Sequence, residues 1–153
     1  MKAVNIYLNF DGKTHDAMKF YAKSLDAKLE VQTVGESGMG GAGVDPTRVI
    51  HARVSNKKNG TILMASDTQQ GAPFSQGNNF YISIDCQSPA EQEKHFKLFS
   101  EGGTVMMPLQ DTFWGARFGI LTDRYGVGWM FNCEMPKPKK KAAPKKKAAK
   151  KRS

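Results

Sequence analysis

Residues 5–11 read Asn-Ile-Tyr-Leu-Asn-Phe-Asp, and residues 79–85 repeat the pattern as Asn-Phe-Tyr-Ile-Ser-Ile-Asp, 74 positions later. Both stretches alternate apolar and polar side chains with the two-residue period of a half-buried β-strand. Each is followed by a helix-like segment and then by further strand-like segments. Self-similarity at a fixed offset is typical of an architecture built from repeated units, so we expect two copies of one module.

The closing segments of the two copies also match. The Gly-x-x-x-Met segment at 60–64 recurs at 126–130, an offset of 66, and His51 corresponds to Arg117 at the same offset. The smaller offset predicts that the first module has the longer internal loop. Residues 35–47 are rich in glycine and are interpreted as this loop, either a linker or a mobile lid.

Each module is expected to run strand, helix and then three strands. The second helix is the better signalled, because Ser88 is an N-cap residue, Pro89 occupies the first helical position and Glu91 lies three after the cap. The first helix is expected to begin near Thr14. The expected strands after the helices are 29–34, 49–54 and 61–65 in the first module and 104–107, 116–122 and 127–133 in the second.

The composition changes abruptly after Glu134. Residues 136–153 contain nine Lys and one Arg and no acidic residue, whereas residues 1–135 contain 13 Lys and Arg against 14 Asp and Glu. The formal charge is therefore +10 on the tail and −1 on the remainder. A segment with this charge and no large apolar residue is predicted to be disordered. Tails rich in Lys, Ala and Pro resemble the C-terminal tails of linker histones.

Residues 1–135 have the length of one compact domain. Cys86 and Cys133 have no metal-like spacing and are interpreted as free, mostly buried thiols of a reducing compartment. No apolar run approaches the ~20 residues of a membrane span, and the N-terminus shows no signal-peptide pattern. We therefore expect a cytoplasmic protein with no membrane partner. If the tail directs its location, we expect association with the nucleoid or, in a eukaryote, a nuclear location.

A set of short motifs resembles the PhnB-like branch of the vicinal oxygen chelate superfamily, which includes glyoxalase I, extradiol dioxygenases and bleomycin-resistance proteins. The matching motifs are YLNFDG at 7–12, FY at 20–21, IHA at 50–52, LMASD at 63–67, PLQDTFWGARFG at 108–119 and DRYGVGW at 123–129. The resemblance covers residues 3–134. It implies an α+β fold in which two tandem modules, about 3–68 and 78–134, form curved mixed sheets around a small-molecule cavity, usually in a homodimer.

Members of this branch are sometimes labelled ubiquinone-type methyltransferases, but no glycine motif for a nucleotide-like cofactor follows a strand here, and no cofactor is expected. In metal-dependent members of the superfamily, the opening and closing strands supply the metal ligands. The resemblance places Asn5, Met64, Asn79 and Met130 at those positions. Because divalent metals favour imidazole and carboxylate over amide and thioether groups, we expect no metal there. A displaced metal held through His51 and Glu134 is the alternative.

Strand alternation predicts which side chains face the cavity. His51 is the histidine expected inside, where it could act as an acid or base with Glu134 or simply be hydrogen-bonded within the fold. Arg117 could bind an anionic group or form an internal salt bridge. The expected ligand-binding residues are Asn5, Tyr7, Asn9, Arg53, Met64, Asn79, Tyr81, Trp114, Arg117 and Met130.

Three functions remain open. The first is a metal-independent protein that binds a small, possibly anionic molecule. The second is a lyase, an isomerase or a related glyoxalase-type enzyme that uses His51 and Glu134. The third is non-specific association with DNA or RNA through the cationic tail. Its expected contacts are Lys137, Lys139, Lys140, Lys141, Lys145, Lys146, Lys147, Lys150, Lys151 and Arg152.

Overall fold

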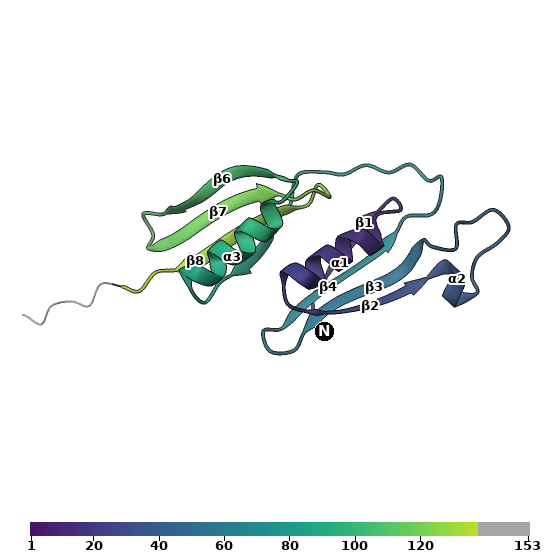
Figure 1. The fold of residues 1–153 in the computed structure, drawn as a ribbon, viewed down its shortest axis with the longest axis horizontal. Coiled ribbons are helices and arrows are strands. Elements are labelled where there is room, and N and C mark those ends of the chain that lie inside the picture. The colour runs from purple at the N-terminus through teal and green to yellow at the C-terminus, as the bar shows by residue number, and fades with distance from the viewer. Residues whose placement is uncertain (138–153) are drawn as a thin grey trace, which may run out of the picture.

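Two modules that share the order strand, helix and three strands lie side by side in the structure, a computed structural model that describes residues 1–137 (Figure 1). The first contains β1 (Ile6–Phe10), α1 (Thr14–Ser24), β2 (Lys28–Thr33), the short α2 (Val34–Ser37), β3 (Val49–Asn56) and β4 (Thr61–Asp67). The second contains β5 (Ile82–Asp85), α3 (Pro89–Ser100), β6 (Thr104–Asp111), β7 (Ala116–Thr122) and β8 (Gly128–Glu134). The predicted α+β class with tandem modules is confirmed. The tail is predicted to be disordered, but residues 138–153 lie outside the part of the chain that the structure describes.

Each module forms its own four-stranded sheet, with strand orders β1-β4-β3-β2 and β5-β8-β7-β6. The first strand of each module pairs in parallel with the last strand, and the other pairings are antiparallel. The helix between the first two strands of a module makes this parallel pairing possible, because a parallel pair needs a crossover connection. The two sheets therefore have identical topology, as the sequence repeat indicated.

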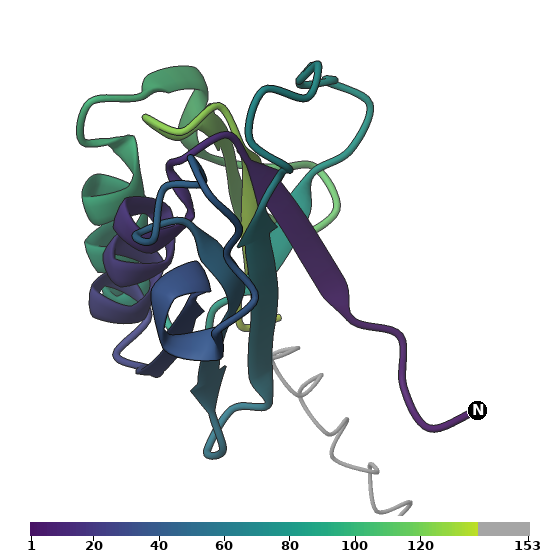
Figure 2. The ribbon, with the colours of Figure 1, turned by 90° about the vertical axis from the view of Figure 1, so that its right-hand side faces the viewer.

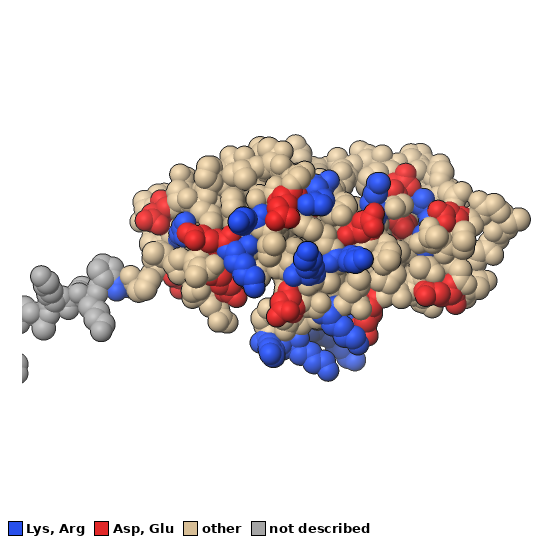
Figure 3. All heavy atoms as spheres, viewed as in Figure 1, with Lys and Arg blue, Asp and Glu red and all other residues tan. Residues whose placement is uncertain are grey.

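The helices α1 and α3 cover one side of the two sheets (Figure 2). Positive and negative side chains are interspersed over this helix-covered side (Figure 3). We call the opposite side of both sheets the open face. Along β1, Leu8 and Phe10 are buried toward the helices, whereas Tyr7 and Asn9 are exposed on the open face. This alternation agrees with the prediction from the sequence pattern.

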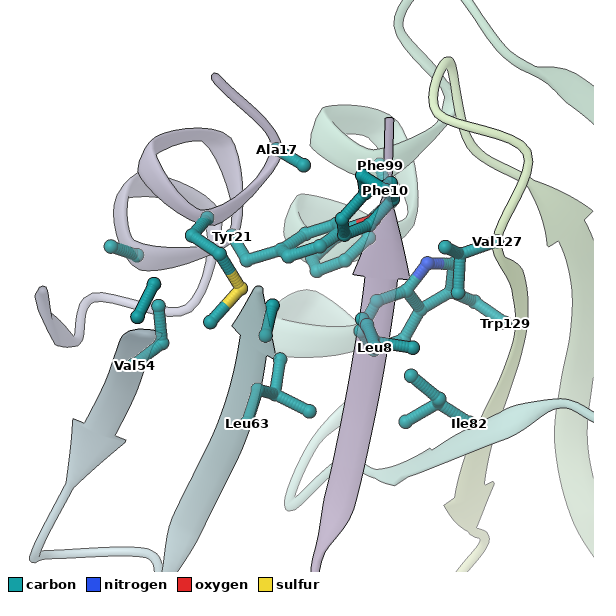
Figure 4. Packing of buried hydrophobic residues seen from close by; sticks show 14 of the residues in the cluster. Leu8, Phe10, Ala17, Tyr21, Val54, Leu63, Ile82, Phe99, Val127 and Trp129 are labelled. Atoms are coloured by element: carbon teal, nitrogen blue, oxygen red, sulfur yellow. The ribbon is translucent and has the colours of Figure 1, made fainter. Parts of the chain in front are cut away.

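One hydrophobic core joins the two modules. It combines the side chains of α1, α3 and the closing strands (Figure 4). The ring of Tyr21 in α1 stacks on Phe99 in α3 with a centroid distance of 6.1 Å, and Phe99 meets Trp129 of β8 at 4.6 Å. Aromatic pairs at these distances contribute beyond the area that they bury. The modules are therefore held together mainly by the aromatic residues behind the sheets.

A buried carboxylate at the junction adds a polar connection. Asp123, 4% exposed in the turn between β7 and β8, accepts hydrogen bonds from Tyr21 Oη (2.6 Å) and Trp129 Nε1 (2.8 Å). Its other oxygen accepts from the backbone N–H groups of Tyr125 (2.8 Å) and Val127 (3.0 Å). Burial, followed by the charge of Asp123, raises the pKa of Tyr21 far above its usual value, so that Tyr21 remains a donor. One side chain thus fixes the turn and ties it to α1.

Several strand boundaries differ from the predicted ones. The predicted strand at 79–85 begins only at Ile82, and β6 continues to Asp111 instead of ending at Met107. The strand predicted at 29–34 ends at Thr33, and α2 follows from Val34 into the glycine-rich loop with a capping box between Thr33 and Glu36. Within residues 1–137, no helix is both long and apolar enough to cross a membrane.

Candidate functional site

The open face of the first module brings five of the predicted site residues together. Tyr7 on β1, Met64 on β4 and Arg53 on β3 lie in one row across neighbouring strands, because β4 pairs Met64 with both of the others. Tyr7 and Arg53 are exposed, and Met64 is partly buried between them. His51 lies two residues before Arg53 on the same face. Asn9, two residues after Tyr7, accepts a hydrogen bond from Ser66 Oγ (3.3 Å).

Tyr7 and His51 are in direct contact on this face. Tyr7 Oη lies 3.4 Å from His51 Nδ1, and the ring centroids are 6.0 Å apart. This oxygen–nitrogen distance is long for a hydrogen bond, so the contact orients the imidazole without closing it off from solvent. The exposed imidazole, phenol and guanidinium can therefore all reach a molecule placed above Met64.

The second module arranges its predicted residues on its own sheet. Tyr81 precedes β5 and its ring covers Gly128, where a Cβ atom would lie 2.7 Å from Tyr81 Cδ1. Met130 on β8 pairs with Ser83 on β5 and is partly buried. Asn79 is exposed in the segment before β5, as Asn5 is in the segment before β1. Among the hydrogen bonds and aromatic contacts of residues 1–137, none joins these residues to Tyr7 or His51.

The predicted orientation of Arg117 is wrong. We expected its side chain to share the open face with His51, but Arg117 Nη1 lies 2.8 Å from Glu93 Oε1 on α3, on the helix-covered side. Arg117 also pairs across the sheet with Cys133, which is buried on that side. The internal salt bridge that the sequence left open is the arrangement observed.

A difference in hairpin length explains the error. Val54 pairs with Leu63, nine positions later, whereas Leu121 pairs with Trp129, only eight positions later. Matching at an offset of 66 therefore aligned β3 and β7 one residue out of register, and a one-residue slip moves every side chain to the other face. Phe118 is thus the counterpart of His51.

Two apolar residues of β7 also lie on the open face. Their apolar side chains favour the core for Phe118 and Ile120, but both residues lie on the open face and are partly buried. The helix-facing residue between them is Gly119, where a Cβ atom would come within 2.8 Å of Phe96 on α3. Only a glycine fits at this helix-facing position, and a glycine gives no apolar signal. The polarity pattern along β7 therefore indicated the wrong face. The two hairpin lengths were the sequence signal that could have corrected it.

The predicted acid–base pair is not formed within one chain. Glu134 ends β8 opposite Ala116 in the second module, whereas His51 lies on β3 of the first (Figure 1). Among the hydrogen bonds and ion pairs of the described residues, none joins the two. The geometry of a single chain therefore favours binding over acid–base chemistry at His51 and Glu134.

Trp114, another predicted ligand-binding residue, lies in the β6–β7 hairpin, where its ring centroid is 6.0 Å from that of Phe118.

The donor atoms at the superfamily's metal positions do not fit a divalent metal. Met64 and Met130 offer thioethers from β4 and β8, and Asn5 and Asn79 offer amides from segments outside the strands. Thioethers and amides are weak ligands for zinc, iron or nickel in comparison with imidazole and carboxylate. Within residues 1–137, no three His, Cys, Asp or Glu side chains form a group that could hold a metal ion.

The sequence interpretation missed one wall of the candidate site. Tyr7 and Asn9 line a cavity of about 210 Å³ together with Phe74 and Phe80, which belong to the segment between the modules. Both phenylalanines are exposed to a similar degree. Phe80 belongs to the predicted strand at 79–85 but lies before β5, and Phe74 belongs to no predicted element. Their position beside Tyr7 depends on how the connecting segment crosses the sheet, which no local pattern encodes.

A family model, a curated protein and a solved structure each match most of this chain. Residues 2–131 match the sequence profile of a family described as 3-demethylubiquinone-9 3-methyltransferase. The chain is 30% identical over 143 residues to Protein YjdN of Escherichia coli K12, covering 86% of this chain and 95% of YjdN. Protein PA1353 of Pseudomonas aeruginosa has a crystal structure that is similar with 37% identity and a TM-score of 0.74, covering 88% of this chain and all of that one.

Two Bacillus cereus structures place the fold in a wider group. A putative 3-demethylubiquinone-9 3-methyltransferase, PhnB protein, is 27% identical with a TM-score of 0.72 over 86% of this chain and 99% of that one. A glyoxalase family protein shares the fold at 10% identity, with a TM-score of 0.63 over 89% and 95% of the two chains. The predicted similarity is confirmed by these findings.

Proposed function

Because the chain belongs to the PhnB-like branch of the glyoxalase, bleomycin resistance and dioxygenase superfamily, we propose that its open face binds a small organic anion without a metal. The observation that carries the proposal is the group formed by Tyr7, His51 and Arg53 around Met64. The description of the family names a methyltransferase, but the proposal rests on these side chains and assigns no methyl transfer to this chain.

The chemistry of the group favours an anion. The guanidinium of Arg53 presents a planar set of donors, and its only acidic neighbour across the strand pair is Glu30, whose carboxylate forms an ion pair with Lys28 (3.0 Å). His51 and Tyr7 add two polar groups that can donate a hydrogen bond. Met64 supplies an adaptable apolar surface beneath them. An aromatic or aliphatic carboxylate or phosphonate fits this combination.

Replacing Arg53 by glutamine is expected to weaken the binding of phenylphosphonate or benzoate by about 1.5–3 kcal/mol, the scale of a lost charged hydrogen bond. Calorimetric titration measures this effect, and His51→Ala should weaken binding in the same direction. Arg124→Gln is the matched control, because Arg124 contacts Glu101 and the ring of Phe20 instead of the open face. Unchanged affinity in both open-face variants, or loss of binding after chelation of metals, would exclude the proposal.

We also propose that a second copy of the chain covers the open face. The β6–β7 hairpin projects Phe113 and Trp114, which are 99% and 57% exposed, and aromatic side chains exposed to this degree are typical of interaction sites. In a two-fold pairing, the hairpin of one copy packs these two aromatic side chains against the open face of the other.

The hairpin aromatics should be hot spots of this dimer, each contributing about 2 kcal/mol or more to association. Replacing both Phe113 and Trp114 by serine is expected to turn a dimer into a monomer at micromolar concentration. Size-exclusion chromatography with light scattering measures the mass, and Met39→Ser, an equally exposed apolar residue outside the hairpin, is the control. A monomeric wild-type chain, or a double variant that stays dimeric, would contradict the proposal.

We propose, finally, that the tail associates with nucleic acid without sequence preference. The support is the division of charge, with ten cations in residues 136–153 and a net charge of −1 on residues 1–135. Phosphate contacts of this kind position a chain on DNA but do not read its bases.

A further inference from the structure

A second cavity, of about 400 Å³, lies between the two modules and includes none of the residues proposed to bind an anion. It is bounded by the β3–β4 hairpin, by β5 and by the beginning of α3. Its volume is within the range of small-molecule sites, which are concave, mostly apolar and lined by a few converging polar groups. Neither the sequence analysis nor the function proposed for the open face explains this cavity.

The lining of the cavity combines apolar and polar side chains. Ile6, Leu63, Ile82 and the buried Trp129 line it from both modules. Asp85, Glu91 and His95 line it from the second module. No Lys or Arg lines the cavity in the part of the chain that the structure describes.

The geometry of His95 fixes which of its nitrogens carries a proton. His95 Nδ1 lies 2.8 Å from the carbonyl oxygen of Ser24 on α1, and only 14% of the side chain is exposed. Because a carbonyl oxygen only accepts, Nδ1 must donate, which leaves Nε2 of the neutral imidazole as an acceptor. His95 is therefore held between α3 and α1.

With a neutral imidazole, Nε2 of His95 and Oε1 of Glu91 are two acceptors with no donor between them, whereas a proton on Nε2 makes the same two groups an ion pair. They lie 3.9 Å apart, beyond hydrogen-bond distance, while Glu91 Oε2 already accepts from the N–H of Gln87 (2.6 Å). A group with two or more N–H donors can satisfy both acceptors at once. Cys86 contributes no competing charge, because burial, and then the carboxylate of Glu91, raise the pKa of its thiol to about 12.

We propose that this cavity binds a primary ammonium group attached to a small apolar body. The ammonium donates one hydrogen bond to Glu91 Oε1 and another to His95 Nε2, with Asp85 adding a second negative charge nearby. The apolar body lies against Ile6, Leu63 and Ile82. The ligand is therefore opposite in charge to the one proposed for the open face, and either site can fail without affecting the other.

The test uses benzylamine as the cation and benzyl alcohol as its neutral counterpart, titrated into the full-length protein by calorimetry and by NMR chemical-shift mapping. Benzylamine should bind saturably, with the largest shifts around Ile82 and Glu91. Glu91→Gln should weaken it by about 10- to 100-fold, because it removes a charged hydrogen-bond acceptor and places an amide donor beside His95. Glu93→Gln is the matched control, since Glu93 lies on the same helix and pairs with Arg117.

A second variant tests whether the effect of Glu91→Gln comes from charge or only from a change in structure. Gln87→Lys introduces a cation at the exposed rim of the cavity and should also weaken benzylamine binding, with an unchanged melting temperature. The proposal is overturned if benzyl alcohol binds as tightly as benzylamine, if Glu91→Gln and Glu93→Gln have equal effects, or if the shifts map to Tyr7 and His51.

Discussion

Replacing Asp123 by alanine is expected to lower the free energy of unfolding by about 3–5 kcal/mol, the usual cost of removing one partner from a buried charged network. The substitution leaves four donors without an acceptor: the Tyr21 hydroxyl, the Trp129 indole and the backbone N–H groups of Tyr125 and Val127. Two of them are buried aromatic side chains at the centre of the core that joins the modules.

Urea denaturation followed by far-UV circular dichroism measures the effect. Tyr21→Phe removes one of the four hydrogen bonds and keeps the ring, so it should cost about 1–1.5 kcal/mol. Asp45→Ala is the control, because the Asp45 carboxylate accepts its hydrogen bonds from Thr47 in an exposed loop, and the change should alter stability by less than about 0.5 kcal/mol. A loss below about 1 kcal/mol for Asp123→Ala would show that the junction does not depend on this carboxylate.

Removing the tail should abolish DNA binding at low salt. If ~5–8 of the ten cations engage phosphates, the slope of log affinity against log salt should be about −4 to −7, since each neutralised phosphate contributes about −0.9. Raising the salt from about 50 to 200 mM should then weaken binding by about 10²–10⁴-fold. The effect should be the same on unrelated duplexes, because the tail has no means of reading base edges.

The experiment compares the full chain with a chain that ends at Glu134, by fluorescence anisotropy over a salt titration. A full-length variant with every Lys and Arg of residues 136–153 replaced by Gln is the matched control, since it keeps the length and removes the charge. Equal binding by all three proteins would locate the interaction in the domain. No binding by the full chain at low salt would reject nucleic-acid association altogether.

The sequence predicted the helices and most of the open face in the first module correctly. Ser88 and Pro89 marked the beginning of α3, and the alternation along β1 separated Leu8 and Phe10 from Tyr7 and Asn9. His51 and Arg53 also lie where the alternation put them, because β3 has apolar Ala52 and Val54 on its buried side. These predictions succeeded where burial and polarity follow one local period.

The predictions failed where packing at a distance decides the outcome. The face of Arg117 depends on a hairpin that is one residue shorter in the second module, and on the close approach of Phe96 to Gly119. The pattern along β7 alone assigns Phe118 and Ile120 to the core. The polarity pattern of a strand shows that its side chains alternate. Which of the two sets faces the core is decided by the pairing with the partner strand and by the helix packed on it.

The sequence by itself therefore determined the two repeated modules, their order of elements and the division of charge between domain and tail, because each follows from local composition or periodicity. Only the tertiary structure decided how the modules meet. It brought Tyr21 to Asp123 across 102 positions, separated His51 from Glu134, and opened a cavity between Glu91, His95 and the β3–β4 hairpin. Such contacts join segments remote in the chain, and their geometry arises only when both modules bury a shared core.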